Sequence, residues 1–294
     1  MKVNKCIFLY NPSSGKGKIK KNLEIIKKTL TEKFGLLDVV ESKSPEHLKE
    51  VVSEGCKTYD YFFFSGGDGT FNMVLNAIPD IPNLPIFGYL PGGSTCDMSY
   101  NLNINKVPKK GVVDLVNSKP KEYNVGQFGN KKFIYVADFG AFTNVSHITP
   151  QDKKRKFGVF AYIYYGIKSV FTTVKAHRVI VDGVVYYTPL MIISNSREVA
   201  SFKINPEKVQ DDGNYYIVIT KNGFMHGIFN VIHLFGFGLE SAIRHKKVIS
   251  FTANNFTIDC DCEDWDVDGE YVKIKFPSFC GYSRKKIVVL TNRE

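Results

Sequence analysis

The most suggestive stretch for chemistry is Gly66-Gly67-Asp68-Gly69-Thr70, which follows an apolar run and precedes a helical pattern. Glycines let the backbone turn tightly and bring its N–H groups close to an anion, and a helix N-terminus adds partial positive charge. The stretch therefore predicts a phosphate-binding loop. A carboxylate there repels phosphate unless a cation intervenes, so Asp68 predicts bound Mg²⁺, with Thr70 capping the helix or contacting phosphate. A plain Gly-Asp-Gly turn is the alternative.

Two further loops of small residues follow apolar runs in the same half of the chain. One covers residues 11–17 and the other residues 92–97. The first contains a Gly-Lys pair but lacks the GxxxxGK[ST] spacing of a Walker-type loop. Because strand patterns alternate with helical patterns here, we expect a parallel sheet with all three loops at the carboxyl ends of its strands. Three such loops predict a site for a nucleotide polyphosphate.

Near the C-terminal end, residues 259–270 carry seven carboxylates in a chain that is otherwise basic. The tract ends in Asp268-Gly269-Glu270. If this end folds back on the phosphate loops, it supplies a general base and a carboxylate for a metal or a polar network. An acidic surface hairpin is one alternative. A metal-binding tract that also uses Cys260 and Cys262 is another.

Composition limits the class of protein. The chain has 294 residues, of which 44% are hydrophobic, and this is enough for two folded domains. A net charge of +10 indicates an acidic partner, such as anionic lipid, a nucleotide or nucleic acid. The absence of a nucleic-acid motif or a basic and aromatic stripe argues against nucleic acid.

Location can also be predicted from composition. No run reaches the roughly 18 apolar residues that a membrane span needs, and the N-terminus lacks a signal-peptide pattern. The six cysteines form no CxxC pair, which fits reduced thiols. We therefore expect a cytoplasmic protein that does not span a membrane.

After about residue 123 the pattern changes to short β-type runs with hairpin signals, such as residues 178–181 and 184–187 around Asp182-Gly183. This predicts a β-rich second half. Residues 157–170 show helical spacing and follow four basic residues, Lys153 to Lys156. They are either a core helix that begins at a solvated charge run or a contact with a membrane surface.

Taken in order, these motifs resemble the diacylglycerol kinase catalytic domain family, which includes bacterial lipid kinases and is related to sphingosine kinases. The resemblance extends over nearly the whole chain. NAD kinases share the Gly-Gly-Asp-Gly-Thr motif and phosphofructokinases have a related one, but the first loop, the 92–97 loop and the terminal Asp-Gly-Glu favour the lipid kinases. The segments that carry the resemblance are Asn11-Pro12 with Ser14-Gly15, residues 66–70 with Asn72, residues 91–97, Arg155-Lys156-Phe157-Gly158, Asn195-Ser196, Asp211-Asp212-Gly213 and Asp268-Gly269-Glu270.

The resemblance implies an α/β plus β fold. Residues 1–123, with residues 284–294 returning to them, would form a Rossmann-like parallel-sheet ATP-binding domain of the NAD kinase and phosphofructokinase type. Residues 124–283 would form a C-terminal β-sandwich that takes the lipid substrate. The returning strand would be residues 286–290, and ATP would lie between the domains.

The resemblance also implies ATP and Mg²⁺ as cofactors and gives roles to single residues. Asp268 would take the proton of the attacking lipid hydroxyl, and Asp68, Asp97 and Glu270 would form a Mg²⁺-linked carboxylate network. A separate structural Mg²⁺ would use Asp212 with main-chain oxygens near Val209 and Asn214, although a β-turn needs the same residues. The expected nucleotide contacts are Asn11, Ser14, Gly15, Ser42, Gly66, Gly67, Asp68, Gly69, Thr70, Asn72, Gly93 and Ser94.

Four positions depart from the family pattern. Cys96 replaces the usual Asn, Met73 a Glu, Asn124 an Asp, and Ala200-Ser201 a Gly-Gly pair. Loss of an Asn contact costs about 1 to 3 kcal/mol where buried groups stay unpaired, which slows turnover roughly tenfold or more without abolishing it. We expect an active but atypical member.

The sequence thus predicts a lipid kinase that transfers the γ-phosphoryl group of ATP to a lipid hydroxyl, with diacylglycerol the first choice and phosphatidic acid the product. The alternatives are an NAD kinase-like enzyme and a catalytically weak member that binds nucleotide or lipid. The expected partner is a lipid at a membrane surface, reached by peripheral contact through Lys153 to Lys156, and not nucleic acid. Because family members often dimerise, a homodimer is one expected assembly.

Overall fold

The computed structural model describes residues 3–93, 96–140, 175–196, 198–199, 202–203, 213–223 and 227–293. They divide into two compact units, Met1–Val125 with Arg284–Glu294, and Gly126–Ser283. The boundary expected after residue 123 lies within a strand, β5 (Lys119–Phe128). The expected helix over residues 157–170 lies outside the described residues, as do Lys153 to Lys156, Ser94, Val209 and Asp212.

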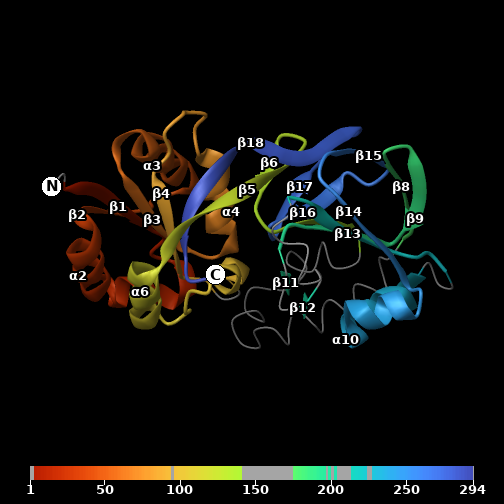
Figure 1. Cartoon of the computed structure of the whole chain (residues 1–294), viewed down its shortest axis with the longest axis horizontal. Helices are drawn as coiled ribbons and strands as arrows, with labels where there is room; N and C mark the ends of the chain where they lie inside the picture. Colours follow the sequence, from red (N-terminus) through yellow and green to blue (C-terminus); the bar gives the residue numbers. More distant parts are fainter. Residues whose placement is uncertain are drawn as a thin grey trace. The chain divides into compact units, whose positions relative to one another are not determined.

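The first unit is built on a parallel sheet in the order β2-β1-β3-β4-β18 (Figure 1). The last strand returns from the end of the chain and pairs with β4 in parallel, with Val289 opposite Phe87. The expectations of a parallel sheet and a returning strand are therefore confirmed. The strands are β1 (Asn4–Tyr10), β2 (Gly35–Glu41), β3 (Tyr61–Gly66), β4 (Ile86–Pro91) and β18 (Ser278–Thr291).

Helices cover both faces of this sheet. Phe62, Phe63 and Phe64 are consecutive in β3 and no more than 1% exposed, so neither face of the strand meets solvent. Phe63 packs on Phe34 of α2 with ring centroids 4.9 Å apart, and Phe64 packs on Phe71 of α4 at 5.1 Å. The helical segments are η1 (Ser14–Gly17), α1 (Lys18–Lys21), α2 (Leu23–Phe34), α3 (Pro45–Thr58), α4 (Asp68–Ala77), α5 (Asp97–Asn101) and α6 (Pro108–Asn117).

Local sequence explains where these helices begin and which side they bury. In α3, Ser44 is the N-cap, and its hydroxyl accepts the N–H of His47 at 3.1 Å. Proline follows at the first helical position, where its missing N–H costs nothing. Leu48, Val52 and Cys56 recur every four residues and are buried against the sheet.

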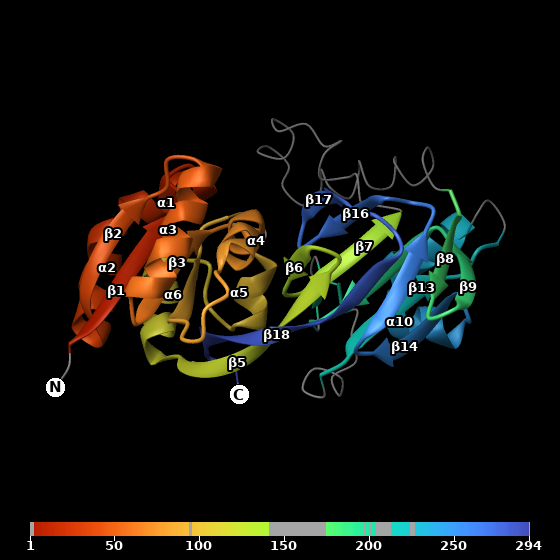
Figure 2. The ribbon, with the colours of Figure 1, turned by 90° about the horizontal axis from the view of Figure 1, so that it is seen from above.

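The second unit contains antiparallel sheets (Figure 2). One has six strands in the order β14-β13-β10-β7-β16-β17, and they are β7 (Val136–Gly140), β10 (Leu190–Ser194), β13 (Tyr215–Thr220), β14 (Val248–Ala253), β16 (Asp264–Val267) and β17 (Glu270–Lys273). The other brings part of β18 together with β15 (Phe256–Cys260), β8 (His177–Val181) and β9 (Val184–Thr188). Shorter elements are β6 (Lys131–Phe133), β11 (Glu198–Val199) and β12 (Phe202–Lys203), and one long helix is α10 (Ile228–Arg244).

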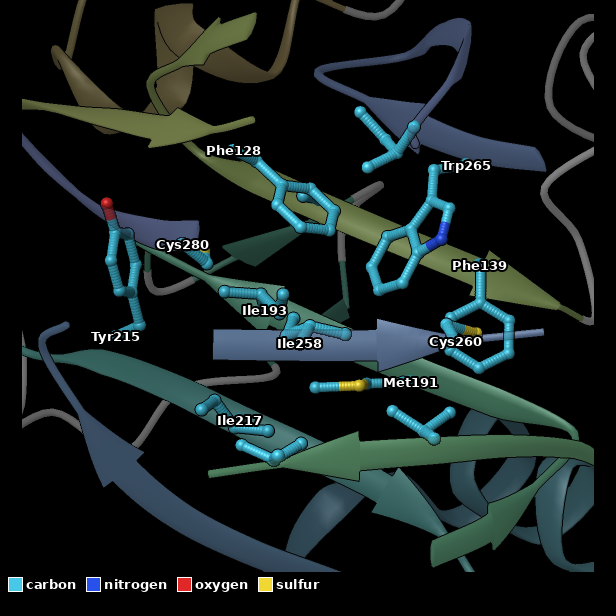
Figure 3. Packing of buried hydrophobic residues seen from close by; sticks show 14 of the residues in the cluster. Phe128, Phe139, Met191, Ile193, Tyr215, Ile217, Ile258, Cys260, Trp265 and Cys280 are labelled. Atoms are coloured by element: carbon cyan, nitrogen blue, oxygen red, sulfur yellow. The ribbon is translucent and has the colours of Figure 1, made fainter. Parts of the chain in front are cut away.

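Side chains from both sheets form one core, which makes the second unit a β-sandwich (Figure 3). Trp265 of β16 is fully buried in this core, with its ring 4.7 Å from that of Phe128 and 4.8 Å from that of Phe139. Ile258 of β15 and Ile217 of β13 contribute from the two sheets. The expected fold class, a parallel α/β unit followed by an antiparallel β unit, is thereby confirmed. Across the described residues, no helix is long and apolar enough to cross a membrane.

Candidate functional site

The three small-residue loops lie together at the carboxyl ends of β1, β3 and β4. Gly92 donates its N–H to the carbonyl of Gly66 at 2.8 Å. A Cβ added to Gly15 would lie 2.1 Å from the carbonyl oxygen of Gly92, and one added to Gly93 would lie 2.5 Å from Cα of Gly67. Only glycine allows this close approach. The expectation that the loops meet at one sheet edge is correct.

The first loop is shaped by its own asparagine. Asn11 donates its N–H to the carbonyl of Ser65 at 3.2 Å, and its Oδ1 accepts the N–H of Ser13 at 2.9 Å. Ser14 then opens η1. Directly after β2, Ser42 donates its N–H to the carbonyl of Tyr10 at 2.9 Å. Predicted nucleotide contacts from β1 and β2 thus stand beside those from β3 and β4.

Asp68 is the first residue of α4, and its carboxylate accepts N–H groups of Cys96, Asp97 and Met98. Burial, followed by the negative charge of Asp97, raises the pKa of Asp68 to about 6, while the three N–H donors oppose this shift. Its Oδ1 atom is buried and has no hydrogen-bond partner. A buried carboxylate oxygen without a donor is a natural ligand for a cation.

Two other residues of α4, Thr70 and Asn72, differ in their contacts. The N-cap is Gly67, without a side-chain cap, so the expectation that Thr70 caps the helix is wrong. Thr70 lies instead within the first turn, buried so close to Gly66 that a Cβ there would be 2.3 Å from its Oγ1. Asn72 accepts a hydrogen bond from Nδ2 of Asn76 at 3.1 Å on its own Oδ1.

Cys96, which stands where the family has Asn, links two of the loops. It is fully buried in the left-handed region with φ of 52°. Its sulfur accepts the N–H of Gly93 at 3.1 Å and lies 3.7 Å from the carbonyl of Gly66. Tyr89 donates its hydroxyl to the same carbonyl at 2.9 Å. Burial raises the pKa of the Cys96 thiol, so it stays neutral and acts through these contacts.

In the second unit, Asp268 occupies the turn between β16 and β17 and is 1% exposed. Its carboxylate accepts three backbone N–H groups, from Ile134 at 2.9 Å, Tyr135 at 3.0 Å and Val136 at 3.1 Å. These donors stabilise the anion and fix its position. The alternative of a purely surface-exposed acidic hairpin is therefore wrong for Asp268, whereas Glu270 at the start of β17 is exposed.

The segment that holds Asp268 is itself held by Asn195. Asn195 donates Nδ2 to the carbonyl of Ile134 at 3.0 Å and its N–H to the carbonyl of Tyr135 at 2.8 Å. Tyr282 donates its hydroxyl to Oδ1 of Asn195 at 2.8 Å. Tyr282 belongs to no sequence motif. Asn195 belongs to the Asn195-Ser196 pair, one of the segments that carry the family resemblance. That pair was the one feature of the sequence that pointed to a residue supporting the Asp268 segment.

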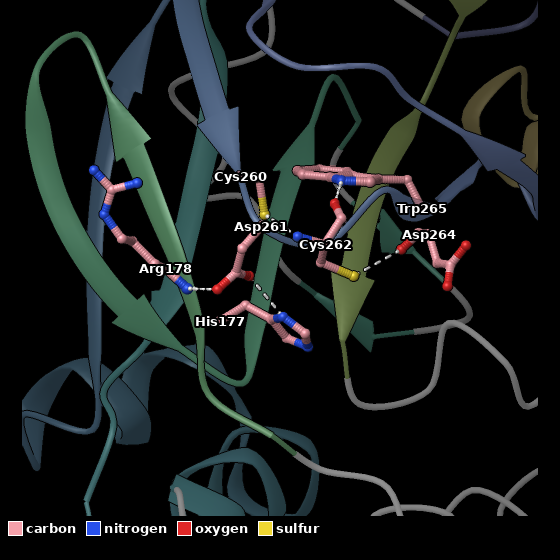
Figure 4. Close-up of polar contacts among 7 residues, drawn as sticks. All are labelled: His177, Arg178, Cys260, Asp261, Cys262, Asp264 and Trp265. Atoms are coloured by element: carbon pink, nitrogen blue, oxygen red, sulfur yellow. Dashed lines mark hydrogen bonds and ion pairs between the residues drawn. The ribbon is translucent and has the colours of Figure 1, made fainter.

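The beginning of the acidic tract has structural contacts (Figure 4). Asp261 contacts Nδ1 of His177 at 2.8 Å and accepts the N–H of Arg178 at 3.1 Å, which joins the tract to β8. Burial raises the pKa of both Cys260 and Cys262. Within the described part of the chain, no three His, Cys, Asp or Glu residues are arranged to hold a metal ion, so the alternative of a metal-binding tract finds no support.

A second carboxylate pair was not expected from the sequence. Asp138 of β7 and Asp266 of β16 are directly opposite each other in the antiparallel ladder. Burial, together with the charges of Asp268 and Glu270, raises the pKa of Asp266 to about 7. Burial and the charge of Asp266 raise the pKa of Asp138 well above its usual value. Oδ1 of Asp266 accepts the N–H of Gly269 at 2.6 Å.

For the separate structural Mg²⁺, the structure describes Asn214, which lies just before β13, but neither Val209 nor Asp212. That site stays a prediction.

The fold and the loops define the class. A parallel α/β unit with glycine loops converging at its carboxyl edge, joined to a β-sandwich, is the plan expected of kinases with the Gly-Gly-Asp-Gly-Thr motif. Residues 5–128 match the model of the diacylglycerol kinase catalytic domain. The resemblance seen in the sequence is confirmed over these residues.

Individual relatives are similar over nearly the full length. The chain is 28% identical over 284 residues to a diacylglycerol kinase of Staphylococcus haemolyticus (strain JCSC1435), covering 92% of this chain and 83% of the relative. It is 27% identical over 277 residues to one of Staphylococcus aureus (strain JH9), covering 90% and 85%. The fold matches a crystal structure of a diacylglycerol kinase from Bacillus anthracis str. Sterne with a TM-score of 0.80 and 21% identity, covering 99% of this chain and 98% of that one.

Proposed function

We propose that this chain transfers the γ-phosphoryl group of ATP to the free hydroxyl of diacylglycerol, forming phosphatidic acid for phospholipid metabolism. The match of residues 5–128 to the family model and the similarity to the named relatives support a lipid kinase. The choice of diacylglycerol follows the names of the relatives from both staphylococci. The observation that carries the chemistry is at Asp68, whose carboxylate keeps one buried oxygen without a hydrogen-bond partner among three glycine-rich loops.

The loops of the first unit supply the proposed nucleotide site. Backbone N–H groups in glycine-rich turns favour phosphate, and the start of α4 adds partial positive charge. Phosphoryl transfer needs little covalent help from a protein, so alignment and charge neutralisation account for most of the rate. The proposed contacts are Asn11, Ser14, Gly15, Ser42, Gly66, Gly67, Asp68, Gly69, Thr70, Asn72, Gly93 and Ser94.

The residues present fit Mg²⁺. This ion is commonly held by one or two carboxylates plus substrate phosphates and water, so a dedicated cage of three protein ligands is not required. Asp68 offers a buried oxygen without a hydrogen-bond donor, and Asp97 is close enough to raise its pKa. Asp68 and Asp97 would hold the ion, with Glu270 as the third member of the network, and the bound ion would neutralise charge on the phosphates.

Asp268 is the proposed acceptor of the hydroxyl proton. Three N–H donors fix the direction of its carboxylate. In a phosphoryl transfer with a loose transition state the hydroxyl proton leaves late, so orientation of the base matters more than its strength. Asn195 and Tyr282 support this orientation through the backbone that Asp268 contacts.

The test supplies radiolabelled ATP, Mg²⁺ and short-chain diacylglycerol, and counts label in the organic phase. We expect labelled phosphatidic acid from the wild type and at least a hundredfold less, roughly 3 kcal/mol of lost transition-state stabilisation, from Asp97→Asn. Glu32→Gln, on the exposed face of α2, serves as the control of unchanged activity. Label in NADP from added NAD would favour the NAD kinase-like alternative. ATP binding without any labelled product would favour the catalytically weak member.

Access to a bilayer substrate, a cytoplasmic location and a homodimer stay predictions. The first candidate for membrane contact is Lys153 to Lys156, since clustered lysines attract an anionic surface. Unchanged vesicle binding after all four are replaced by Ser would remove that candidate.

A further inference from the structure

Helix α10 presents an aromatic face to solvent that the proposed chemistry does not use. The helix runs along the edge of the second unit (Figure 1). Three of its own residues, Val231, Leu234 and Ala242, are buried. On the opposite side, Phe229 is 50% exposed and Phe237 is 73% exposed. Phenylalanine is normally buried in a soluble protein, so two such side chains on one helix face need an explanation.

The two exposed rings and the half-buried His233 between them form one stripe. Phe229, His233 and Phe237 follow each other at intervals of four, which puts them on the same side of a helix. The rings of His233 and Phe237 are 4.9 Å apart. Nε2 of His233 is also 3.0 Å from the hydroxyl of Ser241, which ties this stripe to the last turns of the helix.

Phe237 projects from a break in the helix. Gly238 has φ of 82°, a conformation that interrupts the helical geometry directly after Phe237. A Cβ added to Gly236 or to Gly238 would meet no atom within 4 Å. There is therefore free space beside the backbone on both sides of Phe237, and the ring can enter a bilayer without displacing protein atoms.

Cationic side chains follow this aromatic stripe. Exposed Arg244 lies in the last turn of α10, and exposed Lys246 and half-buried Lys247 follow directly after it. From residue 228 to residue 247, Glu240 is the one carboxylate in the sequence. Exposed Phe beside Lys and Arg is the composition of a helix that lies in the interface of an anionic bilayer, where rings enter the acyl boundary and cations meet lipid phosphates.

We propose that α10 and the residues that follow it, 228–247, dock this protein on an anionic phospholipid surface. The site would take lipid headgroups at the cationic end, with Phe229 and Phe237 inserted beside them. The charge of the whole chain, +10, complements the same surface. The inference rests on the proposed function only in that a lipid kinase must reach its substrate in a bilayer. It differs from the contact predicted at Lys153 to Lys156.

The experiment measures co-sedimentation with vesicles of phosphatidylcholine, with and without phosphatidylglycerol. We expect binding that requires phosphatidylglycerol and falls about tenfold in Phe237→Ser, because a ring that partitions into the bilayer is lost. Lys246→Gln with Lys247→Gln should lower binding roughly 25-fold, at about fivefold for each charge. Leu36→Ser is the matched control for apolar exposure, and Lys109→Gln with Lys110→Gln is the control for charge; all three positions lie in the first unit.

Two further measurements keep the interpretation separate from the kinase assay. All variants should phosphorylate a short-chain diacylglycerol dissolved in water at the wild-type rate. Vesicle binding that depends on α10 without any phosphorylation would sustain the docking site and overturn the proposed function. Wild-type vesicle binding by Phe237→Ser and by the double Lys variant would overturn the docking site. So would a Phe237→Ser variant that changes the molecular mass in solution while binding vesicles normally, since a second copy would then be the occupant.

Discussion

In each of two carboxylate pairs in this protein, burial and a neighbouring negative charge raise a pKa, that of Asp68 in the first pair and those of Asp138 and Asp266 in the second, yet the surroundings of the two pairs differ. Asp68 of the first pair, Asp68 and Asp97, lies among glycine loops and keeps one buried oxygen without a hydrogen-bond donor. The second pair, Asp138 and Asp266, lies across two hydrogen-bonded strands. A raised pKa therefore does not by itself mark a catalytic site. The unpaired oxygen and the surrounding loops separate the two pairs.

The two pairs should also respond differently when one of their carboxylates is neutralised. If a cation binds at Asp68 and Asp97, their charges are needed for function, and neutralising either should damage turnover. If Asp138 and Asp266 only share a proton within a sheet, neutralising one should relieve repulsion without damage. Substitution by Asn, which keeps shape and an acceptor oxygen, distinguishes these cases at both sites.

The largest expected effect is on activity. Asp68→Asn should lower kcat about a thousandfold, because it removes the charge that holds Mg²⁺ against the phosphates. Asp266→Asn should leave kcat within about threefold, since the Asn oxygen can still accept the N–H of Gly269. The measurement is kcat with short-chain diacylglycerol at saturating ATP and Mg²⁺. Comparable losses in both variants would end the distinction between the pairs.

The next effect concerns stability at Asp268. Asp268→Ala should lower the free energy of unfolding by about 3 kcal/mol or more, because three buried N–H groups lose their acceptor. Glu270→Ala, two residues along the same turn but exposed, should change it by less than about 0.5 kcal/mol. Urea denaturation of both variants measures the difference. Loss of activity in Asp268→Ala counts as chemical only in molecules shown to be folded.

A third effect depends on pH. Because the pKa of Asp266 is raised to about 7 in the folded state from a usual value of 3.8, the folded protein binds more protons between these values, and wild-type stability falls as pH rises through that window. Asp266→Asn removes the titrating group. Its gain over the wild type should be roughly 2 to 4 kcal/mol at pH 8 and should disappear near pH 4. Thermal melts at both pH values test this, and a gain that grows at low pH would contradict it.

The smallest effect concerns Cys96. Cys96→Ala removes the sulfur that accepts the Gly93 N–H, so KM for ATP should rise about three- to tenfold with little change in kcat. Cys96→Asn, which restores the residue usual in the family, should lower KM to the wild-type value or below. Initial rates over a range of ATP concentrations separate the two constants. An unchanged KM in Cys96→Ala would show that the thiol does not position the loop.

Much of this arrangement could be predicted from the sequence. Short apolar runs ending in glycine-rich loops give strands with loops at one edge, because parallel strands share a direction, and the loops do meet there. The β-rich second half follows from its hairpin signals, such as the Asp182-Gly183 turn between β8 and β9. These features depend on local pattern and on chain direction, which the sequence contains.

The remainder could not be predicted because it depends on contacts between distant residues. The three N–H groups that hold Asp268 come from residues more than 130 positions earlier, and they are backbone groups, which no side chain in the sequence reveals. Asp138 meets Asp266 only through strand pairing. Thr70 resembles a helix cap in sequence, but the helix begins at Asp68, so the residue lies one turn too late for that role.

The central claim is that Asp68 and Asp97 form the Mg²⁺-nucleotide site while Asp138 and Asp266 do not. Calorimetric titration of ATP into the wild type, Asp97→Asn and Asp266→Asn, each with and without Mg²⁺, tests it most directly. We predict that Mg²⁺ strengthens ATP binding at least tenfold in the wild type and in Asp266→Asn, but not in Asp97→Asn. A Mg²⁺ effect that survives in Asp97→Asn, or is lost in Asp266→Asn, would contradict the account.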